Sequence, residues 1–229
     1  MKSTLLTTCT LVLGLGLVAG TAAAQVKQAR QTGAFSAIRA SGAVDVRLKQ
    51  GTQTAVVLEA REEVLSYMRT EVQNGVLRIY RDHDKEGMSA SLRNLLNSSD
   101  NKVIVYITVP KLTGVELSGA SEVKSESAFT ADDFSIKASG ASEVTLSLKA
   151  KTLAVSASGA SDIHLSGQVE RQQVHISGSS DYHASDLLSK QATVEASGAS
   201  DAYVSAESLS SHASGASDVH NKSKAYGVH

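Results

Sequence analysis

The sequence has little of what many binding and catalytic proteins depend on. Its 229 residues include one cysteine, one proline, no tryptophan, three phenylalanines and six tyrosines. The single cysteine, Cys9, lies in an N-terminal apolar segment, so the rest of the chain has no thiol from which to form a disulfide. Scarce aromatic rings argue against carbohydrate clefts and single-stranded nucleic-acid platforms that rely on stacking. The single proline argues against a proline-rich stalk.

Charge of one sign is also lacking. The chain has 22 Lys and Arg residues against 23 Asp and Glu residues, and its formal net charge is −1. Nucleic acids and anionic membrane surfaces attract proteins with a clear excess of basic residues. We therefore expect no nucleic-acid partner.

Residues 1–24 have the pattern of a signal peptide. Lys2 supplies a positive start, residues 5–19 form an apolar run, and Ala22 to Ala24 provide a cleavage site of small residues before Gln25. The apolar run is too short to be a good membrane span. We expect no transmembrane segment in the chain once the signal peptide is removed. The mature chain, residues 25–229, is expected to be one exported domain, located in the periplasm, on the outer surface or in the medium.

A short phrase, Ser-Gly-Ala-Ser-Asp/Glu-Val, recurs at nearly even intervals and most strongly over residues 112–221. The glycines of its six copies are Gly119, Gly140, Gly159, Gly178, Gly198 and Gly215, and the segment from Ser41 to Val46 is a seventh, degenerate copy. A period near twenty residues with internal alternation is typical of stacked coils of strand, in which no unit buries its apolar side alone. The sequence therefore predicts an all-β fold, a parallel β-helix (β-solenoid) of stacked coils, with additional β-strands at its N-terminal end.

Alternation within the repeat separates an inner face from an outer face. Three positions around each glycine are mostly apolar and are expected to fill the interior: Val115, Ile136, Val155, Val174, Val194 and Ser211; Leu117, Ala138, Ala157, Ile176, Ala196 and Ala213; and Val123, Val144, Ile163, Tyr182, Ala202 and Val219. The repeated glycine predicts a bend at which a side chain would obstruct the neighbouring coil. The serine two residues later, if it points inward, should hydrogen-bond along the stack.

The N-terminal half contains further strand signals. We expect strands over 54–59, 69–72, 76–80 and 102–109, the last ended by Pro110, with a hairpin turn at Gln73-Asn74-Gly75. Residues 82–101 are polar and rich in Ser and Asn, which indicates an excursion from the fold. Asp82-His83-Asp84 is interpreted as part of this loop.

These features together resemble the bacterial head GIN domain family of auto-transporter adhesins. The segments that carry the resemblance are Phe35 to Ile38, Ala43 to Gly51, Val72 to Ile79, Val103 to Leu112 and the repeats that begin at Leu117 to Val123. The resemblance covers nearly the whole mature chain. It implies an exported β-helical domain of the cell envelope and supplies no catalytic residues.

An acidic position three residues after each glycine is the first candidate site. Its members are Glu122, Glu143, Asp162, Asp181, Asp201 and Asp218, with Asp45 in the degenerate copy. Stacking places such side chains about 4.8 Å apart, where like charges repel by roughly 1 kcal/mol in water. Calcium could relieve this repulsion. A plain solvated row, screened by salt, is the favoured interpretation, so no cofactor is expected and calcium is kept as an alternative.

A second outward position follows two residues later. It holds Lys124, Thr145, His164, His183, Tyr203 and His220, so three Asp-x-His pairs share the acidic face. Zinc and copper accept such ligands, but the position varies between coils and no coil offers three donors. His175 and His212 are expected to be solvated on an outer face. No nucleophile elbow or cluster of acids outside the rows is present, so no enzyme activity and no metal site are predicted.

The sequence therefore predicts an exported, non-enzymatic β-helical protein that binds an envelope or cell-surface partner in the manner of an adhesin. One alternative is a structural or self-assembling envelope module. Another is a solenoid that binds calcium or another metal through the acidic row.

Overall fold

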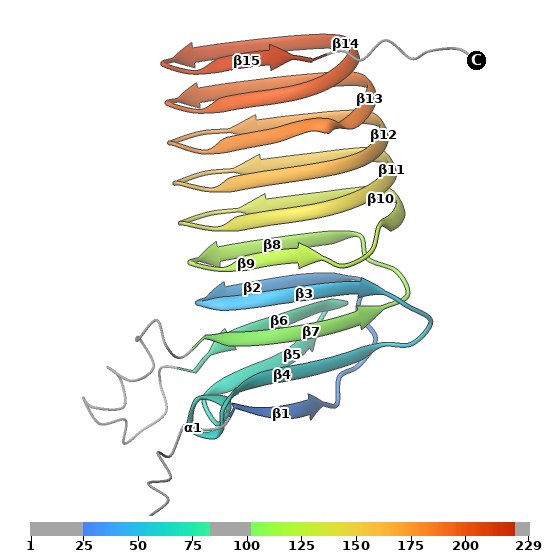
Figure 1. Cartoon of the computed structure of the whole chain (residues 1–229), viewed down its shortest axis with the longest axis vertical. Coiled ribbons are helices and arrows are strands. Elements are labelled where there is room, and N and C mark those ends of the chain that lie inside the picture. The colour runs from blue at the N-terminus through green and yellow to red at the C-terminus, as the bar shows by residue number, and fades with distance from the viewer. Residues whose placement is uncertain (1–24, 83–101, 223–229) are drawn as a thin grey trace, which may run out of the picture.

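The computed structural model describes residues 25–82 and 102–222. Its strands wind into a β-solenoid with about five turns of stacked parallel strands (Figure 1), which confirms the predicted fold class. The elements are β1 (Gln25–Arg30), β2 (Ala37–Gly42), β3 (Val44–Gln50), β4 (Ala55–Arg61), α1 (Glu62–Leu65), β5 (Met68–Gln73), β6 (Val76–Arg81), β7 (Val103–Val109), β8 (Gly114–Gly119), β9 (Glu122–Ser125), β10 (Phe129–Ala138), β11 (Glu143–Ala157), β12 (Asp162–Ile176), β13 (Asp181–Gly198), β14 (Asp201–Gly215) and β15 (Asp218–Asn221).

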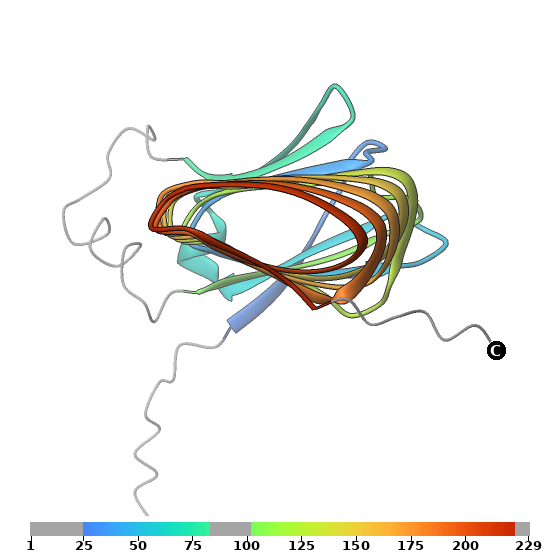
Figure 2. The same ribbon diagram turned by 90° about the horizontal axis from the view of Figure 1, so that it is seen from above.

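Two long sides enclose the interior, as the view along the stack shows (Figure 2). The first sheet contains β1, β4, β7, β3, β9, the N-terminal halves of β11 to β14, and β15. The second sheet contains β5, β6, β2, β8, β10 and the C-terminal halves of β11 to β14. Each coil passes between the sheets by a rounded corner on one edge and by a sharp turn at the repeated glycine on the other.

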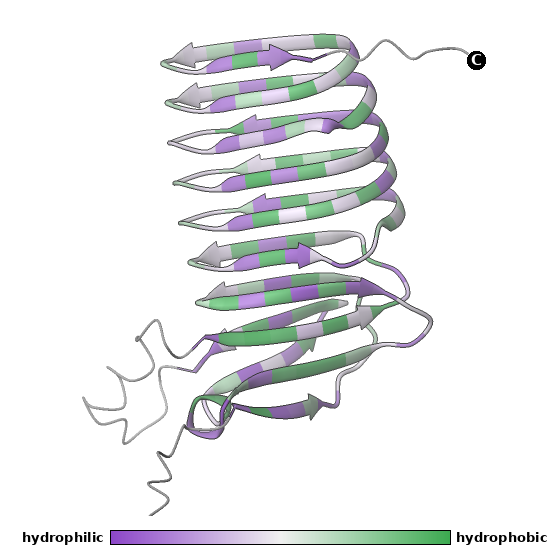
Figure 3. Ribbon diagram, viewed as in Figure 1, coloured by the Kyte–Doolittle hydropathy of each residue, from purple (hydrophilic) through white to green (hydrophobic). Residues whose placement is uncertain are grey.

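The three predicted apolar rows form the core. Their members from Val115 to Ala202 are all buried, including Val115, Val123 and Tyr182, and hydropathy alternates along the strands of the repeated coils (Figure 3). Only the last coil departs from this pattern, because Ser211 and Ala213 are exposed and Val219 is half-buried. The core is therefore continuous along the stack and ends where no further described coil covers it.

The glycine row has the backbone reason that the repeat predicted. Gly159 has φ of +84°, and a Cβ placed on it would lie 2.6 Å from the carbonyl oxygen of Gly140 in the coil before. A left-handed φ disfavours any other residue, and the close approach leaves no room for a side chain. The seven glycines of the repeat, from Gly42 to Gly215, stack on one another in this way.

The serine row points inward and bonds along the stack, as expected. Ser142, Ser161, Ser180 and Ser200 are buried. The Ser180 hydroxyl donates to the carbonyl of Ser177, 3.0 Å away, and its oxygen lies 3.4 Å from the amide nitrogen of Ser161, which donates to it. These contacts satisfy a polar group that would otherwise be costly to bury.

The N-terminal end is closed by strands that run against the solenoid direction. The turn at Gly42 stacks beneath that at Gly119, although β4 to β7 intervene in sequence. β4 pairs antiparallel with β7 and with β1, and β5 pairs antiparallel with β6 through the predicted hairpin. Asn74 and Gly75, at the centre of that turn, both have positive φ. β1 and the short helix α1 were not predicted.

Two sequence predictions fall on residues outside the described ranges. These are the signal peptide, residues 1–24, and most of the excursion, of which only Asp82 is described. In the described part of the chain, no helix is long and apolar enough to cross a membrane.

Candidate functional site

The predicted acidic row lies along the outer surface of the first sheet. Cα register pairs Asp45 with Glu122, Glu122 with Glu143, Glu143 with Asp162, Asp162 with Asp181, and Asp201 with Asp218. Towards the C-terminus the row also has a structural task. The amide of Asp201 donates to Asp181 Oδ1 and the amide of Asp218 donates to Asp201 Oδ1, each at 3.3 Å. Aspartate here therefore helps to hold the start of the following coil.

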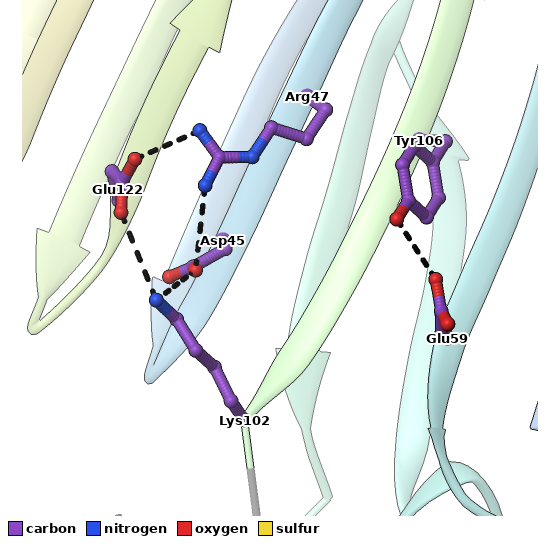
Figure 4. A network of polar contacts seen from close by, with 6 residues as sticks. All are labelled: Asp45, Arg47, Glu59, Lys102, Tyr106 and Glu122. Carbon is purple, nitrogen blue, oxygen red and sulfur yellow. Dashed lines mark hydrogen bonds and ion pairs between the residues drawn. The ribbon is translucent and has the colours of Figure 1, made fainter. Parts of the chain in front are cut away.

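The N-terminal end of the row is neutralised by two cations (Figure 4). Asp45, only 5% exposed, contacts Lys102 Nζ and lies 3.9 Å from Arg47 Nη2. Glu122 accepts from Arg47 Nη1 at 2.9 Å and lies 3.8 Å from Lys102 Nζ. The hydrogen bond from Lys102 to Asp45 raises the pKa of the lysine above its usual 10.5. Nearby, the Tyr106 hydroxyl donates to Glu59 at 2.8 Å, and this bond raises the pKa of Tyr106.

The remaining five acids of the row are not paired with cationic side chains of the described residues. These acids are Glu143, Asp162, Asp181, Asp201 and Asp218. Within the described ranges, no Lys, Arg or His side chain forms an ion pair with any of the five. The first sheet thus carries a line of carboxylates that grows more negative from β9 towards β15.

Beside the acids, four rings form a continuous stack. The centroids of His164 and His183 are 4.6 Å apart with planes inclined by 10°, those of His183 and Tyr203 are 5.4 Å apart, and those of Tyr203 and His220 are 5.0 Å apart. Lys222 Nζ lies 5.4 Å from the Tyr203 centroid. Ring faces are occupied by neighbouring rings, so the stack presents ring edges to solvent. The repeat predicted that these residues share one outward row, but it did not predict that their rings stack.

The described residues form no cluster of metal-ligating side chains. Among residues 25–82 and 102–222, no three His, Cys, Asp or Glu side chains are grouped so that they could hold a metal ion. The rings of His164 and His183 lie nearly parallel, with an angle of 10° between their planes, and so are stacked face to face. Asp82 is bound to Arg69 at 2.8 Å, while His83 and Asp84 lie outside the described residues.

A hollow on the second sheet was missed by sequence reasoning. It encloses about 680 Å³ and lies over five successive levels of the stack, from Lys111 and Thr113 to Gln191 and Thr193. A smaller hollow of about 140 Å³ shares Ser135, Ala154 and Gln173 with it, and a third of about 330 Å³ continues past His175 to His212. The three hollows form an oblique trough, here called the polar trough. Beside its upper part, His175 Nδ1 and Glu195 Oε2 lie 2.9 Å apart.

A buried polar chain crosses the interior between these two surfaces. The Tyr182 hydroxyl donates to Gln172 Oε1 at 2.7 Å, Gln172 Nε2 donates to Ser189 Oγ at 2.8 Å, and Ser189 Oγ donates to the carbonyl of Ser205 at 3.1 Å. Complete burial raises the pKa of Tyr182. The register of β13 is irregular on both sides: towards β12 it shifts between His164 and Ser166, and towards β14 it shifts between Ala184 and Leu188. These shifts accommodate coils of unequal length.

Comparison with solved structures shows the same architecture in other bacterial proteins. A putative adhesin from Bacteroides fragilis matches with a TM-score of 0.74 and 18% identity, over 86% of this chain and 97% of that one. A putative adhesin from Parabacteroides distasonis matches with a TM-score of 0.64 and 17% identity, over 87% and 98%. A putative lipid binding protein from the same species matches with a TM-score of 0.59 and 16% identity, over 86% and 96%. At these identities the likeness shows the fold.

Sequence comparison identifies the family. No curated protein matches the chain significantly. The family model described as "Putative auto-transporter adhesin, head GIN domain" matches residues 34–225, which include β2 to β15. The match spans both the acidic row and the polar trough, and it confirms the resemblance carried by the repeats. The chain therefore belongs to the head GIN domain family of auto-transporter adhesins.

Proposed function

We propose that this protein is an exported, non-catalytic binding protein of the cell envelope that acts as an adhesin. The observation that carries the proposal is the pair of rows on the first sheet, in which carboxylates and stacked rings repeat from coil to coil. Family membership supports an adhesin-like role at the cell surface.

The acidic row is the proposed contact surface. Its six members are Glu122, Glu143, Asp162, Asp181, Asp201 and Asp218, of which Glu122 is already neutralised by Arg47. The other five carboxylates form no ion pair with a described residue and repeat at intervals of about 4.8 Å, so an envelope or cell-surface partner with repeated cationic groups would meet several at once. Single contacts between exposed charges are weak, and repetition raises the overall affinity. Binding of this kind weakens with salt.

A cell-binding assay tests this proposal. The fluorescently labelled mature chain, residues 25–229, is titrated onto bacterial cells at low and at physiological salt. The triple variant Asp162→Asn, Asp181→Asn, Asp201→Asn should bind at least tenfold more weakly than the unmodified chain. The matched control is Glu126→Gln, Glu170→Gln, Glu207→Gln, which removes the same charge from exposed positions outside the row. Equal binding by the two triples, or no cell binding by the unmodified chain, would contradict the proposal.

Two alternatives would give different results in a simpler measurement. Thermal unfolding of the mature chain with EDTA, calcium or zinc, at two protein concentrations, separates them. A rise in melting temperature with calcium would favour a metal-binding solenoid. A strong dependence on protein concentration would favour a self-assembling structural module.

A further inference from the structure

The polar trough lies on the outer surface of the second sheet, opposite the acidic row. Its side chains come from two outward rows, Asp133, Thr152, Arg171 and Gln191, and Ser135, Ala154, Gln173 and Thr193. Small side chains at Ser135 and Ala154 leave space between longer neighbours. From the level of Thr113 to that of His212 the trough spans five coil steps, about 24 Å at about 4.8 Å per step. It is long enough for an extended polymer.

Hydrogen-bonding capacity in the trough is unused by the protein. Arg171, Gln191 and Thr193 are exposed, and their side chains make no hydrogen bond or ion pair with any described residue. Thr152, by contrast, donates to Asp133, and the buried Gln172 is held by Tyr182 and Ser189. A guanidinium, an amide and a hydroxyl on adjacent coils can both donate to and accept from a ligand rich in hydroxyl groups.

The charges that line the trough balance. The first hollow is lined by two cationic side chains, Lys111 and Arg171, and by two acidic ones, Asp132 and Asp133, of which Asp132 is paired with Lys151 at 2.7 Å. The trough therefore does not select a strongly anionic or cationic ligand, in contrast to the row of carboxylates on the first sheet. Charge complementarity favours an uncharged polar ligand.

The backbone beneath the polar trough has no unpaired strand edge to which an extended peptide could hydrogen-bond. A peptide in extended form binds by main-chain hydrogen bonds to an exposed sheet edge. Here β10, β11, β12 and β13 are paired with one another along the second sheet, residue by residue, so their amides and carbonyls are already engaged. Only side chains are available, and few apolar side chains project outward to receive those of a peptide.

We infer that the polar trough binds a linear, uncharged polysaccharide laid obliquely across the second sheet. Hydroxyl groups of successive sugars are held by Arg171, Gln191 and Thr193 through hydrogen bonds. The scarcity of aromatic rings excludes recognition by stacking and is compatible with this mode, which depends on hydrogen bonds. The trough is separate from the acidic row, so this inference goes beyond the proposed contact and can fail without affecting it.

Affinity electrophoresis of the mature chain tests the inference. Native gels contain one polysaccharide each: galactomannan, xyloglucan, a mixed-linkage glucan or dextran as uncharged probes, and polygalacturonate as an anionic one. At least one uncharged polysaccharide should retard the protein, and polygalacturonate should not. No retardation by any uncharged probe, or retardation by polygalacturonate alone, would overturn the inference.

Two variants locate the binding. Arg171→Ala with Gln191→Ala removes unused donors, and Ala154→Trp fills the trough; each should weaken the apparent affinity at least tenfold, with an unchanged circular dichroism spectrum. The matched control Lys190→Ala removes an exposed cation next to Gln191 that does not line the trough, and it should bind normally. Retardation that persists in both trough variants would assign the polysaccharide to another surface and refute the site.

Discussion

Replacement of one repeated glycine tests the stacking of the coils most directly. In Gly159→Ala, the added Cβ would adopt φ of +84° and lie 2.6 Å from the Gly140 carbonyl oxygen and 3.0 Å from the Gly140 amide nitrogen. The left-handed conformation alone costs roughly 1–2 kcal/mol. Displacement of the neighbouring coil to relieve the contact adds about 1–3 kcal/mol, as in other overpacked sites. We therefore expect a loss of about 2–5 kcal/mol in the free energy of unfolding.

The matched control is Gly42→Ala in the first turn of the stack. Gly42 has φ of +97°, but a Cβ there would meet nothing within 4 Å. Only the conformational cost applies, so this variant should lose roughly 1–2 kcal/mol. Urea denaturation followed by circular dichroism measures both variants against the unmodified mature chain. Equal losses for the two variants, or a loss below about 0.5 kcal/mol for Gly159→Ala, would refute the close stacking of the turns.

Three further predictions concern polar groups. The triple change Asp162→Asn, Asp181→Asn, Asp201→Asn should raise the free energy of unfolding at low salt, by up to about 1 kcal/mol for each repulsion between neighbouring carboxylates that it removes. The melting temperature should not depend on calcium in either protein. A rise with calcium that the triple change abolishes would contradict this prediction. Tyr182→Phe should cost about 1–3 kcal/mol in urea denaturation because Gln172 loses its buried donor, and the additional change Gln172→Leu should recover part of the loss. The pKa of Lys102 is raised in the folded state by its hydrogen bond to Asp45, so its contribution to stability is complete below pH 10.5 and is lost as the pH rises through the higher folded pKa. The free energy of unfolding of Lys102→Met should accordingly fall less than that of the unmodified chain when the pH is raised from neutral to above 10.5. Parallel curves of stability against pH for the two proteins would show that the bond has no effect on stability.

The stack could be predicted because one local rule is repeated. Alternation around Gly119 to Gly215 fixes which side chains face inward, and a slip of one residue would expose Val155 and Ile163 together with every other member of their rows. Ser211 and Ala213 break the apolar pattern in the last coil, and both are exposed. The N-terminal closure was less predictable, since β1 (QVKQAR) is polar and takes its place only by pairing with β4.

The surface sites differ in the same way. Positions of the acidic and ring rows follow from the register, and so sequence reasoning placed Asp162 and His164 on one face. Stacking of His183 on Tyr203 depends on side-chain rotamers, which no repeat specifies. The polar trough depends on the volumes of Ser135 and Ala154 relative to neighbours one coil away. In the sequence, such differences between coils cannot be told from ordinary variation of the repeat. The hollow becomes visible only when the coils are stacked.

The nested turns also determine how this protein responds to force. Each coil of the described stack is bound only to the coils directly before and after it, through contacts such as Ser177 with Ala157 and Ala199 with Gly178. A pull on the C-terminal end would detach β15 and then β14, so the chain would peel coil by coil at low tension. A polymer bound across the flank would load several coils in parallel. Attachment along the side of the stack would therefore bear more tension than attachment at its tip.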